Sequence, residues 1–267
     1  MRKRAIIIGI SSGIGEAIAK ALLAQGYEVM GSYRAEKNIS EQMKSISLPL
    51  DTISCDDIQC FVDCVKEKNF AWDYLILCSG TMEPIGAFEK IDIDKWAGSF
   101  NVNLIGLMRL LHGLLPLRNK QKICKSSVLS LAGGGVNGAP VNYSAYTLAK
   151  IGLIKMTELL AAEIPDVNFI NMGPGWVDTL IHQETIKAAE NAGQAYAETQ
   201  RRLLEKEFVP MDKVVESALT LLGGDADIYS GRNFSVASDQ LDSGALQEAL
   251  REDPEMYKLR RHKNEWQ

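Results

Sequence analysis

The sequence has little of what nucleic-acid-binding, secreted and membrane proteins require. Its 29 lysine and arginine residues are outnumbered by 34 acidic residues, which gives a net charge of −5 at pH 7. No block of basic residues stands out, so nothing supports binding to a nucleic acid. The apolar run after the basic start, Ala5 to Ile8, is too short for a signal-peptide core or a membrane span. We therefore expect a cytoplasmic protein with no membrane partner, and we expect this run to form a buried strand.

Paired cysteines are also missing. The five cysteines are an odd number, and no two of them have the Cys-x-x-Cys spacing. Without a secretory signal, thiols kept reduced in a cytoplasm are the expected state. Cys60 and Cys64 would share one face of a helix, but no histidine lies near them. We therefore expect small buried side chains there and no metal site.

Linkers and internal repeats are absent from the 267 residues. Short apolar runs instead alternate with longer amphipathic stretches, which predicts alternating strands and helices in one domain. We expect strands at residues 4–9, 27–33, 47–50, 74–77, 127–131, 167–172 and 233–237. The pattern predicts an α/β fold, a single Rossmann-like doubly wound domain with a seven-stranded, mostly parallel sheet. Binding sites in such folds lie at the carboxyl ends of the strands.

The chain divides into a main domain and a tail. Residues 1–239 are expected to form the dinucleotide-binding and catalytic domain. Within it, residues 180–207 are polar and helix-prone but lack strong apolar periodicity, which suits a mobile cover over a cleft. The charged residues 240–267 are expected to form a C-terminal extension.

A glycine-rich turn follows the first strand. Residues 9–15 read GISSGIG, a G-x-x-x-G-x-G spacing between a strand and an amphipathic helix. Glycines let a backbone approach a pyrophosphate, and the helix N-terminus offers free N–H groups. The turn therefore predicts a dinucleotide site, although the same spacing alone is equally compatible with a simple tight turn.

No acidic residue ends the second strand. An acid there would accept hydrogen bonds from a ribose 2′-hydroxyl, whereas this chain has Tyr33 and Arg34. An arginine suits a 2′-phosphate because its planar fork donates several hydrogen bonds. We therefore expect NADP(H) as cofactor; a surface arginine without a ligand is the alternative.

Tyr146 and Lys150 are four residues apart in a helical stretch, so they would lie on one face. An ammonium beside a phenol favours the phenolate and would lower the pKa of the tyrosine, which would make it a usable acid or base. Alone, this spacing is also that of any amphipathic helix. Asn103 lies in a mostly apolar helix at residues 92–115 and needs partners for its amide, which a structural hydrogen bond could also supply.

In this order and spacing, the motifs resemble those of the classical short-chain dehydrogenase/reductase family, from Arg4 to about Asp239. The resemblance implies hydride transfer between NADP(H) and a carbonyl or secondary alcohol. It implies that Tyr146 is the acid or base, that Lys150 lowers its pKa and binds the nicotinamide ribose, and that Asn103 holds a proton-relaying water. It also implies a homo-oligomer, a tetramer or a dimer.

The resemblance further implies which residues hold the cofactor. Asp51 would contact adenine, and Val177 and Thr179 would meet the nicotinamide amide and the phosphates. The full implied set is Gly9, Ser11, Ser12, Gly13, Ile14, Gly15, Tyr33, Arg34, Asp51, Cys78, Gly80, Tyr146, Lys150, Pro174, Val177 and Thr179.

Three departures from the family stand out. Ile8 replaces a threonine, and residues 77–80 read LCSG where the family has Asn-Asn-Ala-Gly, two losses that one apolar repacking would explain. The third departure is Ala132, at the position of the catalytic serine in relatives with a triple-glycine turn. Ser130 is the nearest hydroxyl, about 6.6 Å back along the strand. The substrate would border Ser130, Ala132, Tyr143 and Trp176.

Two functions stay open. An NADP-dependent oxidoreductase is favoured by Tyr146, Lys150 and Asn103 together. Ala132 is the best argument for the alternative, a weakly active or inactive NADP-binding regulatory or assembly protein. An epimerase of the extended group fits poorly because of the glycine spacing, and an enoyl reductase fits poorly because its tyrosine–lysine spacing is longer. The sequence does not identify the substrate.

Overall fold

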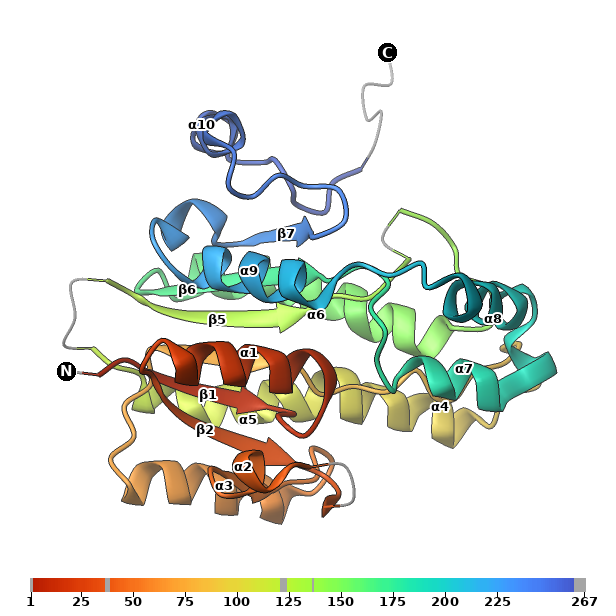
Figure 1. Ribbon diagram of the computed structural model, residues 1–267, viewed down its shortest axis with the longest axis horizontal. Helices are drawn as coiled ribbons and strands as arrows, with labels where there is room; N and C mark the ends of the chain where they lie inside the picture. The colour runs from red at the N-terminus through yellow and green to blue at the C-terminus, as the bar shows by residue number, and fades with distance from the viewer. Residues whose placement is uncertain (1, 37–38, 121–123, 136, 262–267) are drawn as a thin grey trace.

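The structure of the chain, a computed structural model, describes residues 2–36, 39–120, 124–135 and 137–261. In these residues seven strands form one sheet with the order β3-β2-β1-β4-β5-β6-β7 (Figure 1). The strands are β1 (Arg4–Ile8), β2 (Glu28–Tyr33), β3 (Ser47–Pro49), β4 (Tyr74–Leu77), β5 (Ser126–Leu131), β6 (Val167–Gly173) and β7 (Arg232–Ser235). Every neighbouring pair is parallel. The predicted Rossmann-like sheet is confirmed, and in the described residues it is wholly rather than mostly parallel.

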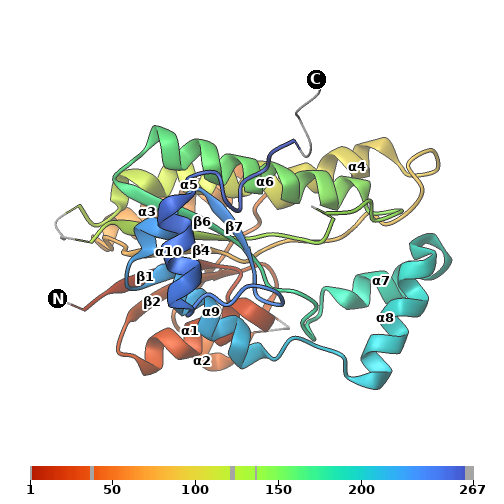
Figure 2. The same cartoon turned by 90° about the horizontal axis from the view of Figure 1, so that it is seen from above.

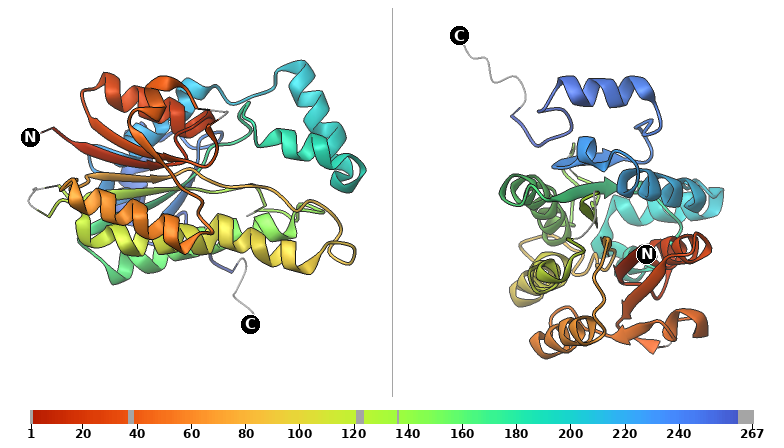
Figure 3. Two further views of the ribbon diagram at one scale, coloured as in Figure 1. Left: turned by 90° about the horizontal axis from the view of Figure 1, so that it is seen from below. Right: turned by 90° about the vertical axis from the view of Figure 1, so that its left-hand side faces the viewer.

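Helices cover both faces of the sheet (Figure 3). One face carries α1 (Gly13–Ala24) and α9 (Met211–Leu222), and the other carries α3 (Cys55–Glu67), α5 (Gly106–Leu114) and α6 (Ser144–Glu163). Successive strand residues point to opposite faces, so Ala5 and Ile7 pack in one core layer and Ile6 and Ile8 in the other. Burial on both faces explains why β1 is an almost unbroken apolar run.

The helix expected at residues 92–115 is not continuous. α4 (Ile93–Phe100) passes into a π-helical turn, η2 (Asn101–Ile105), before α5 begins and a 3-10 turn, η3 (Leu115–Leu117), ends it. Asn103 stands at the centre of the π-helical turn. Such turns inside α-helices are often found at functional sites.

The whole stretch from Ile93 to Leu117 is long and apolar enough to cross a membrane. Its α5 portion, however, is part of the core, because Leu107, Leu110 and Leu114 are fully buried against the sheet. Core packing therefore accounts for the apolar residues of α5.

The predicted cover is helical and lies at the carboxyl ends of the strands. It consists of α7 (His182–Ala188), a 3-10 turn, η4 (Ala189–Ala192), and α8 (Gln194–Glu205). These elements project from the end of the molecule opposite the N-terminus (Figure 2). Ala192 of the cover forms a separate buried apolar cluster with Met82, Ile85 and Tyr143 of the domain beneath it. The cover is therefore packed onto the domain.

The C-terminal extension is also packed rather than loose. It contains a helix that sequence analysis did not predict, α10 (Gly244–Glu252), and Leu250 of this helix is buried in the same core layer as β7. The buried Arg232 guanidinium donates to the Leu250 carbonyl at 2.6 Å, and Asn233 N–H donates to the Tyr257 carbonyl at 3.0 Å. Up to residue 261, the extension thus covers the β7 edge of the sheet.

A second helix without a predictive pattern in the sequence is α2 (Glu41–Lys44), a single turn before β3. The remaining short element is a 3-10 turn, η5 (Ala226–Tyr229), which precedes β7.

Candidate active site

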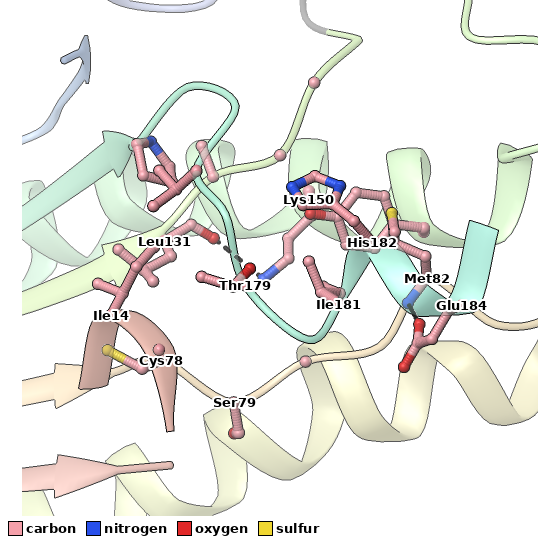
Figure 4. Close-up of a pocket in the computed structure, with 18 of the residues that line it drawn as sticks. Ile14, Cys78, Ser79, Met82, Leu131, Lys150, Thr179, Ile181, His182 and Glu184 are labelled. Atoms are coloured by element: carbon pink, nitrogen blue, oxygen red, sulfur yellow. Dashed lines mark hydrogen bonds between the residues drawn. The ribbon is translucent and has the colours of Figure 1, made fainter. Parts of the chain in front are cut away.

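One large cleft, of about 1520 Å³, opens at the carboxyl ends of the strands under the cover (Figure 4). Its walls come from the β1–α1 turn, the segment after β4, residues 132–135 and 137–140, the start of α6, the segment after β6 and α7. Most residues predicted for the site line it: Gly9, Ser11, Ser12, Gly13, Ile14, Gly15, Tyr33, Arg34, Cys78, Gly80, Ala132, Tyr143, Tyr146, Lys150, Pro174, Trp176, Val177 and Thr179. Asp51, Asn103 and Ser130 are not among its lining residues.

The β1–α1 turn can only be built with glycine. Gly9 has φ +91°, and a β-carbon on it would lie 2.9 Å from the Ser79 backbone nitrogen. A β-carbon on Gly15 would lie 2.0 Å from the Gly9 carbonyl oxygen. Ser12, the N-cap of α1, makes no side-chain capping hydrogen bond. The bare turn and the N-terminus of a twelve-residue helix therefore face the cleft, an arrangement that fits a dinucleotide pyrophosphate.

The side chains at the ends of β2 and β3 were predicted to meet the adenosine part of the cofactor, and only some of them line the cleft. Tyr33 is buried, and Arg34 is exposed at the rim of the cleft. The Asp51 carboxylate turns toward its own loop and accepts from the Ile53 N–H at 3.2 Å. Its neighbours Leu50 and Thr52 line the cleft instead. The position expected to hold adenine thus lies next to the cleft without lining it.

The two apolar departures from the family are neighbours. Ile8 and Leu77 are register partners across β1 and β4, and both are buried in the same core layer. This pairing agrees with the hypothesis of one apolar repacking. Cys78 follows at the cleft, where burial raises the pKa of its thiol to about 12, partly offset by the Lys150 charge.

Tyr146 and Lys150 occupy one face of α6, as predicted. The Lys150 ammonium lies 5.7 Å from the centre of the Tyr146 ring and donates to the Leu131 carbonyl at 3.0 Å. Burial lowers the pKa of Lys150 to about 8. Burial, together with the smaller effect of the Glu184 carboxylate, raises the pKa of Tyr146 to about 12. The expectation of a lowered phenol pKa is therefore wrong for this structure, because desolvation of the phenolate outweighs the nearby cation.

Asn103 lies behind Gly80 rather than in the cleft. Its Nδ2 donates to the Thr81 carbonyl at 2.8 Å and to the Ser99 carbonyl at 3.1 Å, and its Oδ1 accepts from the Thr81 N–H at 3.0 Å. A β-carbon on Gly80 would lie 2.9 Å from Asn103 Oδ1 and 3.4 Å from Lys150 Nζ. Asn103 and Lys150 therefore approach each other across a residue that has no side chain.

Ala132 lines the cleft directly after β5. The next residue, Gly133, shows why a hydroxyl side chain in this turn would have to come from position 132. A β-carbon on Gly133 would lie 2.7 Å from the Tyr146 hydroxyl oxygen, so no side chain fits at that position. Ser130 is buried between the sheet and α6, where its hydroxyl accepts from Asn171 Nδ2 at 2.7 Å and lies 3.4 Å from Thr157 Oγ1. The structure thus does not bring the Ser130 hydroxyl to the cleft.

Aromatic side chains gather at the end of the cleft where sequence patterns predict the substrate. Trp176 stacks between His182, with ring centres 3.8 Å apart, and Phe208, with ring centres 5.5 Å apart. The Tyr143 hydroxyl lies 2.9 Å from Thr185 Oγ1 on the cover. Burial lowers the pKa of His182. Trp176 and Tyr143 therefore bring aromatic rings to a stretch of the cleft wall that also carries polar side chains from α7.

Sequence analysis missed Glu184, whose carboxylate lines the cleft from α7. It accepts from the Met82 N–H at 2.5 Å and from Thr81 Oγ1 at 3.0 Å (Figure 4). An acidic residue in a polar stretch predicts a solvated side chain, and these partners lie 102 and 103 residues away along the chain. No local pattern could have indicated this contact.

Comparisons with known proteins agree with the arrangement. Residues 9–238 match the family model described as enoyl-(acyl carrier protein) reductase. The chain is 27% identical over 242 residues to the benzil reductase ((S)-benzoin forming) of Bacillus cereus, covering 79% of this chain and 97% of that protein. It is 24% identical over 255 residues to the D-beta-hydroxybutyrate dehydrogenase of Rhizobium meliloti (strain 1021), covering 88% and 97%.

Solved structures share the fold. A short-chain dehydrogenase/reductase from Saccharomyces cerevisiae has a TM-score of 0.77 at 21% identity, covering 90% of this chain and 98% of that one. An actinorhodin polyketide ketoreductase variant solved with NADPH also has a TM-score of 0.77, at 22% identity and with 88% and 95% coverage. The chain belongs to the short-chain dehydrogenase/reductase family, a family of oxidoreductases.

Proposed function

We propose that this oxidoreductase transfers a hydride between NADP(H) and a carbonyl or secondary alcohol, with Tyr146 as the proton donor and acceptor. The observation that carries the proposal is a pair of neighbouring side chains, the partly buried Tyr146 and the buried Lys150, in the same cleft as the glycine turn of residues 9–15. A pure binding protein has no need of a buried ammonium beside a cleft-lining phenol, since burial is unfavourable for the charged form of the lysine.

Each group of residues in the cleft would have its own role in the reaction. The glycine turn and the N-terminus of α1 would hold the pyrophosphate, and the bound nicotinamide would supply or accept the hydride. Tyr146, whose raised pKa keeps the phenol protonated well above neutrality, would donate its proton to the carbonyl oxygen as that oxygen gains charge. Lys150 would bind the nicotinamide ribose and stabilise the phenolate that remains. Asn103 would hold the backbone of Thr81 in place, next to the path by which a proton from solvent replaces the one that Tyr146 donates.

Arg34 supports NADP(H) over NAD(H). It stands exposed at the rim of the cleft directly after β2, with a tyrosine rather than an acid before it. A guanidinium there would bind a 2′-phosphate, whereas an acid would repel it. Asp51 would contribute to the adenine side through its loop rather than by direct contact.

The substrate class is proposed from the cleft and the relatives. The apolar cluster under the cover and the stacked Trp176 favour a ketone or alcohol with an apolar body. Two relatives are named for benzil and for hydroxybutyrate, which agrees with a carbonyl or secondary alcohol. An enoyl reductase, the description of the family model, is disfavoured because Tyr146 and Lys150 are only one helical turn apart.

We also propose a cytoplasmic homo-oligomer. All five cysteines are free, which suits a reducing compartment. Ile93, Ile105, Leu148 and Leu159 are exposed on the contacting elements α4, η2 and α6. Such a patch supports association with a second copy of the chain.

A second function is favoured by one observation, the methyl group of Ala132 where a hydroxyl would face the substrate oxygen. A protein that binds NADP(H) without fast chemistry, as a regulatory or assembly subunit, could keep this site. The two functions make different predictions for turnover.

The test is to supply the protein with NADPH and a panel of small ketones, diketones and 3-oxoesters, and to identify the alcohol formed. The proposal predicts that at least one carbonyl compound is reduced, with one NADPH consumed for each alcohol produced. Tight NADPH binding without any alcohol would favour the binding protein. Failure to bind either NADPH or NADH would contradict both functions.

A further inference from the structure

The carboxylate of Glu184 reaches from the cover to the segment after β4. It accepts from the Met82 N–H at 2.5 Å, and its two oxygens lie 3.0 and 3.1 Å from Thr81 Oγ1 (Figure 4). The carboxylate thus holds two consecutive residues of an otherwise irregular segment. Hydrogen bonds to an ionised acceptor are roughly twice as strong as neutral ones.

Thr81 links this contact to Asn103. While its side chain donates to Glu184, its backbone N–H donates to Asn103 Oδ1 at 3.0 Å and its carbonyl accepts from Asn103 Nδ2 at 2.8 Å. One residue therefore separates the cover from the asparagine of the π-helical turn. Because of these two hydrogen bonds, any movement of Thr81 must either break them or move the Asn103 amide with it.

Gly80 extends the same chain of contacts to the reacting end of the site. It directly precedes Thr81 and packs so closely that a β-carbon would lie 2.9 Å from Asn103 Oδ1 and 3.4 Å from Lys150 Nζ. A shift of the segment would therefore change the surroundings of Lys150 as well as those of Asn103.

Other contacts hold the cover independently of Glu184. The Tyr143 hydroxyl lies 2.9 Å from Thr185 Oγ1, and Asn142 Nδ2 donates to the Asn191 carbonyl at 2.9 Å. Both join the cover to the start of α6. Loss of the carboxylate is thus expected to release residues 80–82 while the cover itself stays in place.

We propose that Glu184 is a positioning residue, which fixes the Gly80–Met82 segment from the cover and through Thr81 holds the Asn103 amide in its working orientation. The effect of Glu184 on catalysis rests on the proposed function. Its hold on the Gly80–Met82 segment does not.

The charge of Glu184 has a separate effect. The titratable groups that face it are Glu83 on the segment after β4 and Tyr146 on α6. Burial raises the pKa of Glu184, opposed by the Met82 N–H and the Thr81 hydroxyl, and the carboxylate in turn raises the pKa of Tyr146. A neutral side chain of the same shape would keep the geometry and remove this influence.

Three variants separate these effects: Glu184→Ala, Glu184→Gln and, as a matched control, Glu190→Gln on the exposed end of the same cover. Hydrogen–deuterium exchange is measured first, since it needs no substrate. Glu184→Ala should speed exchange in residues 79–85 and 99–105, and the α1 backbone should be unchanged. Glu184→Gln, which keeps an acceptor for the Met82 N–H, and Glu190→Gln should both resemble wild type. Unchanged exchange in Glu184→Ala would overturn the inference whether or not the protein turns over a carbonyl.

Kinetics then test the catalytic consequence. Glu184→Ala should lower kcat about tenfold, the effect of losing roughly one hydrogen bond in positioning, with NADPH affinity unchanged. Glu184→Gln should recover most of kcat and shift the pH profile of alcohol oxidation to lower pH, because the phenol loses a nearby negative charge. Faster exchange with an unchanged kcat would show that the segment is held for structural reasons only and would overturn the positioning role. Absence of turnover in wild type would contradict the proposed function and leave the exchange comparison to decide the structural claim.

Discussion

The backbone of Gly133 packs directly against the phenol of Tyr146. A β-carbon on residue 133 would lie 2.7 Å from the hydroxyl oxygen and 2.8 Å from Cζ. Any hydroxyl side chain that serves the substrate from this turn must therefore come from position 132, where the chain has alanine.

Restoring that hydroxyl should improve the enzyme. Removing one preorganised donor from a developing oxyanion typically costs about 10²–10³ in rate. We expect Ala132→Ser to raise kcat/KM for small diketones at least tenfold, a conservative part of that range, with NADPH affinity unchanged. Gly133→Ser is the matched control and should lower kcat/KM, because its β-carbon would displace Tyr146. A fast wild-type enzyme that Ala132→Ser slows would show instead that alanine is a specificity feature.

Arg34 should decide the choice of cofactor. Removing one charge-assisted contact to a phosphate is worth about 1.5–3 kcal/mol, or roughly ten- to a hundredfold in affinity. Arg34→Ala should therefore weaken NADPH binding at least about tenfold and leave NADH binding almost unchanged. Titration of both reduced cofactors by fluorescence gives the two dissociation constants. Equal affinity of the wild-type protein for the two, or tighter binding of NADH, would contradict the preference for NADP(H).

The buried ammonium of Lys150 should lower the free energy of unfolding at neutral pH. Its pKa falls from 10.5 in the unfolded chain to about 8 in the folded protein because it is buried. Below the folded pKa the ammonium is charged in both states and its burial cost is fully present. As pH rises from about 8 toward about 10.5, only the folded state loses its proton, so the free energy of unfolding should increase.

The comparison that isolates this effect is Lys150→Met, which keeps an apolar stem without a charge. Near pH 7 this variant should unfold at higher temperature and denaturant concentration than wild type. Its advantage should shrink by on the order of 2 kcal/mol between about pH 7 and about pH 9.5. An advantage that does not depend on pH would mean that the folded pKa of Lys150 is not lowered.

The fold could be predicted almost entirely from the sequence, and the site could be predicted in part. Short apolar runs predicted the strands. The glycine turn of residues 9–15 predicted the cofactor side of the cleft, and the spacing of Tyr146 and Lys150 predicted its reactive side. All of these are local sequence patterns. α2 and α10 have no strong local signal; α10 is defined by burial of Leu250 against β7.

The remaining site features depend on distant contacts. The direction of the Tyr146 pKa shift depends on burial by residues far along the chain, and the role of Glu184 depends on Thr81 and Met82. Likewise, Ser130 has the correct strand parity, yet Asn171 on β6 holds its hydroxyl. A single sequence carries no record of such partners.

The central claim is that Tyr146 carries the proton, and the most direct test compares two tyrosines of the same cleft. Tyr146→Phe should reduce kcat at least about a hundredfold, the usual contribution of a positioned acid, while NADPH binds as before. Tyr143→Phe, which removes a hydroxyl bonded only to Thr185 among the described residues, should keep most of the rate. Turnover of a carbonyl compound by Tyr146→Phe at a rate near that of wild type would contradict the account.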